Sequence, residues 1–373
     1  MGGFLKFAEW ARTYGPFFGT KLLGRQFIFI ASEQVANDLL VKRGAVHAGR
    51  PPIHMVNDSQ GKKTAQYMAL MSANSEWARH KKSNQINMQA AVRKQFYDYP
   101  GIEAKRLVWN VLQDSSNWTR QVEDLTSRVI SSLCWGTVDI AAAIRDESHL
   151  IQVHLSPAGM LPNLVPELQK LPAWLQPFPW KRAEQRRLEN QQALFLKSLQ
   201  DVRLRMEEGD NTPSFARACI EDMKSQKPTM HNDLDAGWAV GALALMSVFT
   251  ASGPILSTIK ALIMFPAWAR KVQDELDAIV GDTRMPEIED IPNLPILRAC
   301  IREALRCWPP IPTGMDNIPS RFPPQLTSTR RHTPRSRSRR HLQRPPHPQR
   351  LSNLPFGARH VPRRLHLPKS LHL

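Results

Sequence analysis

The chain has 373 residues, 42% of them hydrophobic, and a formal net charge of +17 at pH 7. This composition excludes a disordered chain or a short disulfide-rich domain, and it supplies apolar material for one large or two ordinary domains. The four cysteines are scattered, without a spacing that indicates a disulfide framework or a zinc site, and such sparse cysteine is typical of a reducing compartment.

The first fifty residues predict a helix, a hairpin and a second helix. The start of the chain shows neither a secretory signal nor a membrane anchor, and it opens as an amphipathic helix over 4–14. We therefore expect a cytoplasmic location. Two short apolar strands, 17–24 and 25–31, are expected to form a hairpin, and a helix over 33–43 to be capped by Ser32.

Helical periodicity continues over most of the chain to residue 308. The segment 161–180 interrupts it with prolines among Leu, Trp and Phe, so we expect a proline-braced connection there and not a continuous helix. The other helices are expected at 77–91, 101–112, 122–134, 180–208, 214–225, 267–280 and 293–308.

Residues 236–259 form the longest apolar run, 24 residues without a charge. Its length would suit a transmembrane helix, but Gly253-Pro254 lies in its interior and five Ser or Thr residues interrupt it. Charged amphipathic helices flank it on both sides, a pattern typical of a helix that other helices bury on every face. We therefore expect a long buried central helix in a mainly α fold with a small β-sheet, of the α+β class.

A change of composition marks the end of the folded part. Residues 314–373 hold 13 Lys and Arg against one acid, whereas the first 313 residues have a net charge of only +5. Arg, Pro, Ser and His dominate this tail, which cannot bury enough apolar surface to offset its ordering entropy. We expect a folded domain over 1–313 and a disordered basic tail over 314–373, for which a shifted reading frame or a splice error is one hypothesis.

The helix before this boundary carries the most specific motif. In the segment Arg-Glu-Ala-Leu-Arg-Cys-Trp-Pro-Pro over 302–310, Glu303 and Arg306 lie one turn apart, where they can form a charge-assisted pair. This segment resembles the Glu-x-x-Arg signature of the cytochrome P450 family, with its trailing pair of prolines. The resemblance implies a structural role for the pair, whereas its spacing alone is also that of an ordinary surface ion pair.

Two earlier segments resemble landmarks of the same family. Trp77 and Lys81 match the Trp-x-x-x-Arg motif that contacts a heme propionate, with lysine in the place of the arginine. In the central apolar run, Thr250 matches the threonine that assists oxygen activation, while Phe249 replaces the acid of the proton relay. The structural alternatives are that Trp77 is a core residue and that the central run is a kinked core helix without a catalytic role.

The resemblance implies a heme cofactor, a NADPH-dependent reductase as partner and O2-dependent oxidation of a small apolar substrate. The pattern is closest to fungal members that tailor polyketide-like secondary metabolites, and the family normally resides on the endoplasmic reticulum membrane. The cysteine thiolate of a glycine-rich loop ligates the iron in this family. Residues 354–367 are a degenerate likeness of that loop, in which the cysteine is missing between Val361 and Pro362. We therefore expect a truncated member without a metal ligand, inactive as written, with heme binding lost or weakened.

The alternative is a non-catalytic scaffold whose basic tail binds nucleic acid or another polyanion. The run Arg-Ser-Arg-Ser-Arg-Arg over 335–340 resembles an arginine/serine nucleic-acid-binding segment. No aromatic residue lies between Phe322 and Phe356, so base stacking and sequence-specific recognition are not expected. The degenerate monooxygenase is therefore the favoured interpretation, and nucleic-acid binding ranks below it.

Overall fold

The computed structural model describes residues 3–22, 25–47, 49–51, 53, 56, 66–95, 98–155, 163, 165, 168 and 180–311. All of these residues belong to one compact unit that runs from Met1 to Phe322. The expected tail over 314–373, the heme-loop remnant at 354–367 and most of the proline-braced connection at 161–180 lie outside the described residues.

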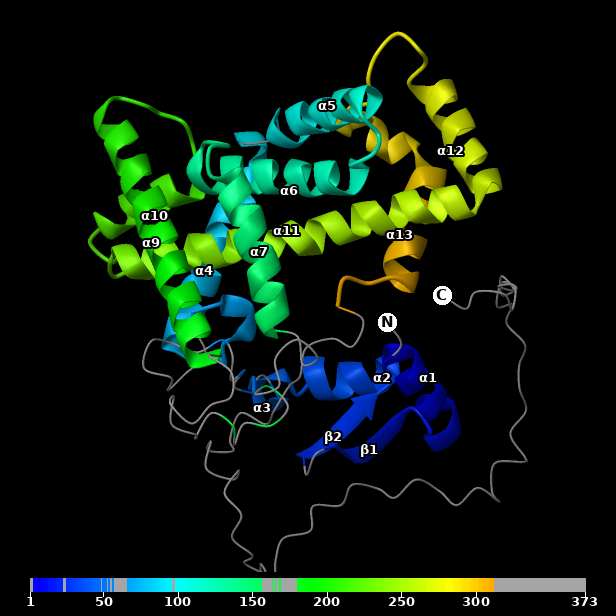
Figure 1. The fold of residues 1–373 in the computed structure, drawn as a ribbon, viewed down its shortest axis with the longest axis horizontal. Helices are drawn as coiled ribbons and strands as arrows, with labels where there is room; N and C mark the ends of the chain where they lie inside the picture. The colour runs from blue at the N-terminus through cyan, green and yellow to red at the C-terminus, as the bar shows by residue number, and fades with distance from the viewer. Residues whose placement is uncertain are drawn as a thin grey trace, which may run out of the picture. The chain divides into compact units, whose positions relative to one another are not determined.

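A helix and a two-stranded sheet form the N-terminal part of the fold (Figure 1). Helix α1 (Gly3–Tyr14) leads into strands β1 (Phe17–Leu22) and β2 (Arg25–Ile30), which pair antiparallel. Phe18 and Phe29 face each other across this pair, and their rings stack with centroids 5.2 Å apart. The hairpin expected from these two short apolar segments is confirmed.

Short helical segments connect the hairpin to the main helical part. Helix α2 (Glu33–Ala36) begins as expected at Ser32, whose hydroxyl oxygen accepts the Val35 N–H at 3.5 Å. The same helix continues as a π-helical turn, so the expected helix over 33–43 has two geometries. The connecting segments are η1 (Asn37–Val41), α3 (Gly44–His47) and η2 (Met68–Leu70).

Long helices make up most of the described chain. They are α4 (Ser75–Ala90) with its π-helical extension η3 (Ala91–Gln95), α5 (Asp98–Gln113), α6 (Trp118–Trp135), α7 (Ala141–Leu155), α9 (Trp180–Glu207), α10 (Phe215–Met223), α11 (Asp233–Met264), α12 (Pro266–Ile279), the 3-10 segment η5 (Ile288–Asn293) and α13 (Pro295–Cys307). Every helix expected from periodicity is present, and α7 is an addition to them. The fold is mainly α with a small β-sheet, as expected.

Helix α11 runs through the centre of the helical part and contacts α4, α6, α7, α9, α10, α12 and α13 (Figure 1). Between Asp235 and Leu245 nearly every residue is buried, because small side chains let the neighbouring helices approach closely. From Met246 onward most residues are only half-buried. The helix is long and apolar enough to cross a membrane, yet 44% of its most apolar stretch is buried in the protein. Burial is therefore confirmed for the first half, and the helix continues through Pro254 to its end.

Gly241 of α11 lies directly against the ring of Phe195 from α9. A β-carbon added there would lie 2.3 Å from Cδ1 of Phe195, a residue that is 1% exposed and packs edge-on against Trp238. The ring therefore has no room to retreat. We expect Gly241→Ala to lower the free energy of unfolding by about 1–3 kcal/mol in urea titrations. Gly101→Ala on α5, where an added β-carbon meets nothing within 4 Å, should be neutral or slightly stabilising; equal losses at both positions would contradict this account.

Candidate functional site

Helix α4 carries the two residues expected to contact a heme propionate. The Asn74 side chain caps the helix, accepting the Trp77 N–H at 2.7 Å. The Lys81 ammonium nitrogen lies 4.6 Å from the centre of the Trp77 ring, in a cation–π contact. Trp77 is half-buried and Lys81 is exposed. The structure thus brings the expected pair together at the surface of α4, and Trp77 is not fully enclosed in the core.

An open groove of about 500 Å³ lies beside this pair. Besides Trp77 and Lys81 it is lined by Leu40, Gly44, His47, Arg50, Met68, Ala69 and Met71. Apolar and basic side chains are combined in this lining, and none of the lining residues is acidic. The groove is therefore suited to an anion with an apolar body.

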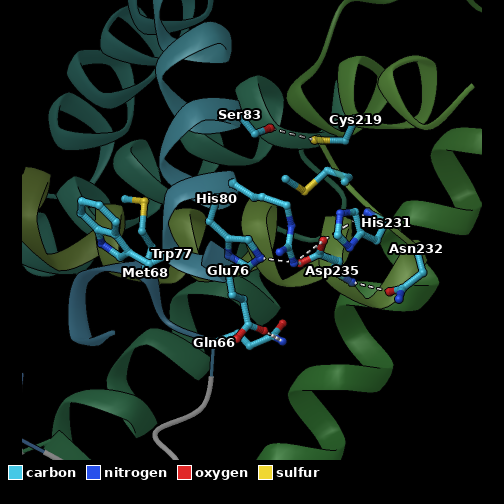
Figure 2. A network of polar contacts seen from close by, with 12 residues as sticks. Gln66, Met68, Glu76, Trp77, His80, Ser83, Cys219, His231, Asn232 and Asp235 are labelled. Atoms are coloured by element: carbon cyan, nitrogen blue, oxygen red, sulfur yellow. Dashed lines mark hydrogen bonds and ion pairs between the residues drawn. The ribbon is translucent and has the colours of Figure 1, made fainter. Parts of the chain in front are cut away.

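A buried carboxylate joins α4 to the first turn of α11 (Figure 2). Asp235 lies 2.7 Å from Nε2 of His80 and 3.3 Å from Nη2 of Arg79, and it accepts the backbone N–H of His231 at 3.2 Å. The Asp235 N–H donates to the side chain of Asn232, which caps α11. His80 is fully buried and Asp235 is 5% exposed, so water does not compete for these bonds. We call these residues the Asp235 clamp.

The pKa of the Asp235 carboxyl reflects two opposing effects. Burial raises it, but hydrogen bonds from His80 and from the His231 N–H, together with the nearby charges of His80 and Arg79, outweigh burial and lower it to about 2. The carboxylate is therefore ionised at neutral pH. Within the described part of the chain, Nδ1 of His80 has no hydrogen-bond partner, so Asp235 supplies the one acceptor that this imidazole uses.

The orientation of α4 depends on polar contacts, because its buried residues are all polar. They are His80, Ser83, Asn84 and Asn87. Ser83 Oγ lies 3.5 Å from the Cys219 sulfur (Figure 2), and Asn84 Nδ2 lies 3.7 Å from the Met68 sulfur. Contacts to sulfur are weak hydrogen bonds, whereas the bonds to Asp235 are charge-assisted. The Asp235 clamp therefore fixes the rotation of α4 and, with it, the direction of the Trp77–Lys81 pair.

Thr250 and Phe249 lie in the half-buried second part of α11. The Thr250 hydroxyl donates to the carbonyl oxygen of Met246 at 2.9 Å, so it is engaged within its own helix. Phe249 has no group that can carry a proton. This geometry is that of a core helix, and the role of Thr250 in oxygen activation stays a prediction.

Glu303 and Arg306 form the expected ion pair on α13. Nε and Nη2 of Arg306 donate to the two carboxylate oxygens of Glu303 at 2.8 and 2.6 Å, and these bonds lower the pKa of Glu303. The two side chains are 51% and 70% exposed. In the described chain α13 is anchored elsewhere: its first N–H groups, at Ile296 and Leu297, donate to Glu275 of α12 at 2.8 and 2.9 Å. A structural role for the Glu303–Arg306 pair stays a prediction.

All four cysteines are free thiols. Cys134 and Cys219 are buried and Cys300 and Cys307 half-buried, and burial raises the pKa of each thiol. The charge of Arg306 acts in the opposite direction on Cys307 but is outweighed. Over the described ranges, no group of three His, Cys, Asp or Glu side chains could hold a metal ion.

The expected site residues fall into three separate pairs, on α4, α11 and α13. Among the residues that the structure describes, no hydrogen bond, ion pair or ring contact joins one pair to another. The Asp235 clamp was not predicted. The sequence did contain a signal for it. Asp235 follows Asn232 by three residues, and this spacing of a capping residue and an acid is a pattern of helix starts. Its partners on α4 carry no comparable signal.

Comparison with known proteins gives a consistent set of matches. Residues 2–319 match the family model described as cytochrome P450. The chain is 27% identical over 327 residues to cytochrome P450 monooxygenase fogE of Aspergillus ruber, a match that covers 85% of this chain and 59% of that protein. It is 28% identical over 314 residues to cytochrome P450 monooxygenase iboC of Amanita muscaria, covering 83% and 54%. A third match, cytochrome P450 monooxygenase 105 of Postia placenta, is 28% identical over 319 residues and covers 83% and 60%. The chain thus spans less than two thirds of the length of these relatives.

Proposed function

The chain belongs to the cytochrome P450 family, and from this membership we propose that it descends from an enzyme that oxidised a small apolar, polyketide-like substrate with O2. Its curated relatives are fungal monooxygenases, and proteins of this family carry heme. Electrons would come from a NADPH-dependent reductase. A cytoplasmic location stays a prediction from the sequence.

We further propose that the 373-residue chain is inactive as a monooxygenase. The observation that carries this proposal is the position of its cysteines: Cys134 lies in α6, Cys219 in α10, and Cys300 and Cys307 in α13, so none lies in a glycine-rich loop. The described residues therefore do not fit a heme that needs a thiolate ligand. The groove at Trp77 and Lys81 could still receive the carboxylate of an apolar anion, since its lining contains no acid.

The test is the optical spectrum of the purified chain with hemin supplied. After reduction and addition of CO, we expect no Soret band at the long wavelength that is typical of thiolate ligation, because all four cysteines lie in helices and none lies in a glycine-rich loop. A Cys307→Ser variant should give the same spectrum as the unchanged chain. A thiolate-type band that disappears in Cys307→Ser would overturn the proposal and identify Cys307 as the ligand.

The distribution of charge supports a second candidate, a scaffold that binds polyanions through its tail. Residues 314–373 carry 13 of the 50 Lys and Arg with one acid. Replacing Arg335, Arg337, Arg339 and Arg340 with glutamine should weaken RNA binding by the full chain at least about tenfold and flatten its salt dependence. Replacing Arg182 and Arg186 on α9 should change little. Unchanged RNA affinity in the tail variant would exclude this candidate.

A further inference from the structure

The groove beside Trp77 and Lys81 contains a histidine that makes no other polar contact. His47 is the last residue of α3 and lines the groove as a half-buried side chain. Over the described ranges, neither of its ring nitrogens has a hydrogen-bond or ion-pair partner. His80, in contrast, lies outside the groove lining and faces Asp235 at 2.7 Å. The groove therefore holds one imidazole whose nitrogens are available to a ligand.

Basic and apolar side chains share the lining of the groove with His47. Arg50 and Lys81 supply positive charge, and Leu40 and Met71 supply apolar surface. Every lining residue belongs to the part of the chain that the structure describes. The volume of about 500 Å³ lies within the range of about 300–1,000 Å³ that is usual for cofactor sites. A flat apolar anion that carries a metal atom matches the imidazole, the cations and the apolar walls together.

We propose that His47 ligates the iron of a heme bound in this groove, in place of a thiolate from a glycine-rich loop. The porphyrin ring itself supplies four of the iron's ligands, so one protein side chain is enough and a cluster of three is not needed. Imidazole is the proximal ligand of the iron in globins and peroxidases. Lys81 and Arg50 pair with the propionates, which are the negative groups of the heme.

This inference rests on the proposed function and extends it. A thiolate donates the electron density that favours O–O cleavage, and an imidazole does not take over this role in a monooxygenase. A chain ligated through His47 would therefore hold heme and still be inactive as a monooxygenase. Two other arrangements compete with it. Hemin could adhere to apolar surface without a bond to iron, or a histidine of the tail such as His360 could be the ligand.

The first experiment titrates the purified full chain with hemin and records the optical spectrum after reduction and addition of CO. We expect one hemin per chain and a Soret band at the shorter wavelength that is typical of histidine ligation. His47→Ala should lose this band and bind hemin at least about tenfold more weakly, since even groups that only support a metal ligand contribute about 10–100-fold. His149→Ala removes a 52% exposed imidazole outside the groove and should change neither.

The outcomes separate this inference from the proposed function. A thiolate-type band would contradict both. A histidine-type band that persists in His47→Ala and disappears in His360→Ala would place the ligand in the tail, and it would contradict this inference alone. A chain that binds no hemin would also contradict this inference alone, because the proposed loss of activity would stand.

The second experiment uses metal-free protoporphyrin IX, which has the propionates but no iron, and follows binding by fluorescence. Lys81→Gln should weaken the binding of hemin and of the metal-free ring about fivefold each, the size expected for one exposed ion pair. Lys82→Gln removes the same charge from the next exposed residue, outside the groove lining, and should have no effect. His47→Ala should weaken hemin binding alone. Equal losses for both ligands in His47→Ala would show that this residue only shapes the groove, and would overturn the proposal.

Discussion

Replacing Asp235 with alanine should lower the free energy of unfolding by about 3–5 kcal/mol, as is typical when one partner of a buried charge pair is removed. The substitution leaves the fully buried His80 without its acceptor and takes from Arg79 its contact on α11. It also removes the carboxylate that accepts the His231 N–H. Denaturant titration followed by circular dichroism would measure the loss.

The matched control is Asp233→Ala in the same helical turn. Asp233 pairs with Arg203 at 2.7 Å, but these side chains are 52% and 42% exposed. An exposed pair contributes about 1 kcal/mol or less. Both acids interact similarly with the positive end of α11. If Asp235→Ala and Asp233→Ala lowered the free energy of unfolding equally, the loss would come from the negative charge at the start of α11 and not from the contacts of the Asp235 clamp.

The same clamp gives a dependence of stability on pH. Because the pKa of Asp235 falls from 3.8 to about 2 on folding, its contribution is complete above pH 3.8 and is lost as the pH falls through about 2. Asp235→Asn should therefore flatten the acid limb of the stability curve relative to the unchanged chain. An acid limb identical in both proteins would show that another carboxylate controls it.

Replacing Glu184 of α9 with alanine should also lower the free energy of unfolding by about 3–5 kcal/mol, the loss expected when a buried ion pair loses one member. Glu184 accepts from Nε and Nη2 of Arg187 at 2.7 and 2.5 Å, and Arg187 is 4% exposed. After Glu184→Ala the guanidinium would keep the hydroxyl of Tyr67, 2.9 Å from Nη1. That hydroxyl cannot replace the lost charge, because burial, only partly offset by Arg187, raises the pKa of Tyr67 to about 12.

Glu303→Ala is the control for this substitution. The Glu303–Arg306 pair has the same spacing of three residues and the same two-pronged geometry, but it is exposed. The Glu303→Ala variant should therefore lose about 1 kcal/mol or less of its free energy of unfolding. Replacing Glu184 and Arg187 together with methionine should recover most of the loss, since no unpaired charge would then remain buried. A double variant as unstable as Glu184→Ala would assign the effect to packing.

The helices were predictable wherever their apolar residues repeat at helical spacing. The predicted helices therefore match α12 and α13 to within two residues at each end, having been expected at 267–280 and 293–308. Helix α7 was missed because its sequence mixes alanines with charged and polar residues. It buries Ile144 and Ile151 in the core. Tertiary packing stabilises this helix more than its own periodicity does.

The candidate site was predictable only within single helices. Trp77 with Lys81 and Glu303 with Arg306 are each within one turn, so their contacts follow from helical geometry. The Asp235 clamp could not be found in this way, because His80 and Asp235 are 155 residues apart. Apolar periodicity also gives no information on how α4 is oriented, because the residues that α4 buries are polar.

The cap that Glu275 places on α13 has a consequence for the order of folding. Its two hydrogen bonds close loops of 21 and 22 residues, whereas the contact between His80 and Asp235 closes one of 155. Short loops lose less chain entropy and form sooner. The contact between α12 and α13 is therefore expected to form before the transition state of folding. The contact between α4 and α11 is expected to form after it. Changes at Glu275 would then act on the rate of folding, and changes at Asp235 on the rate of unfolding.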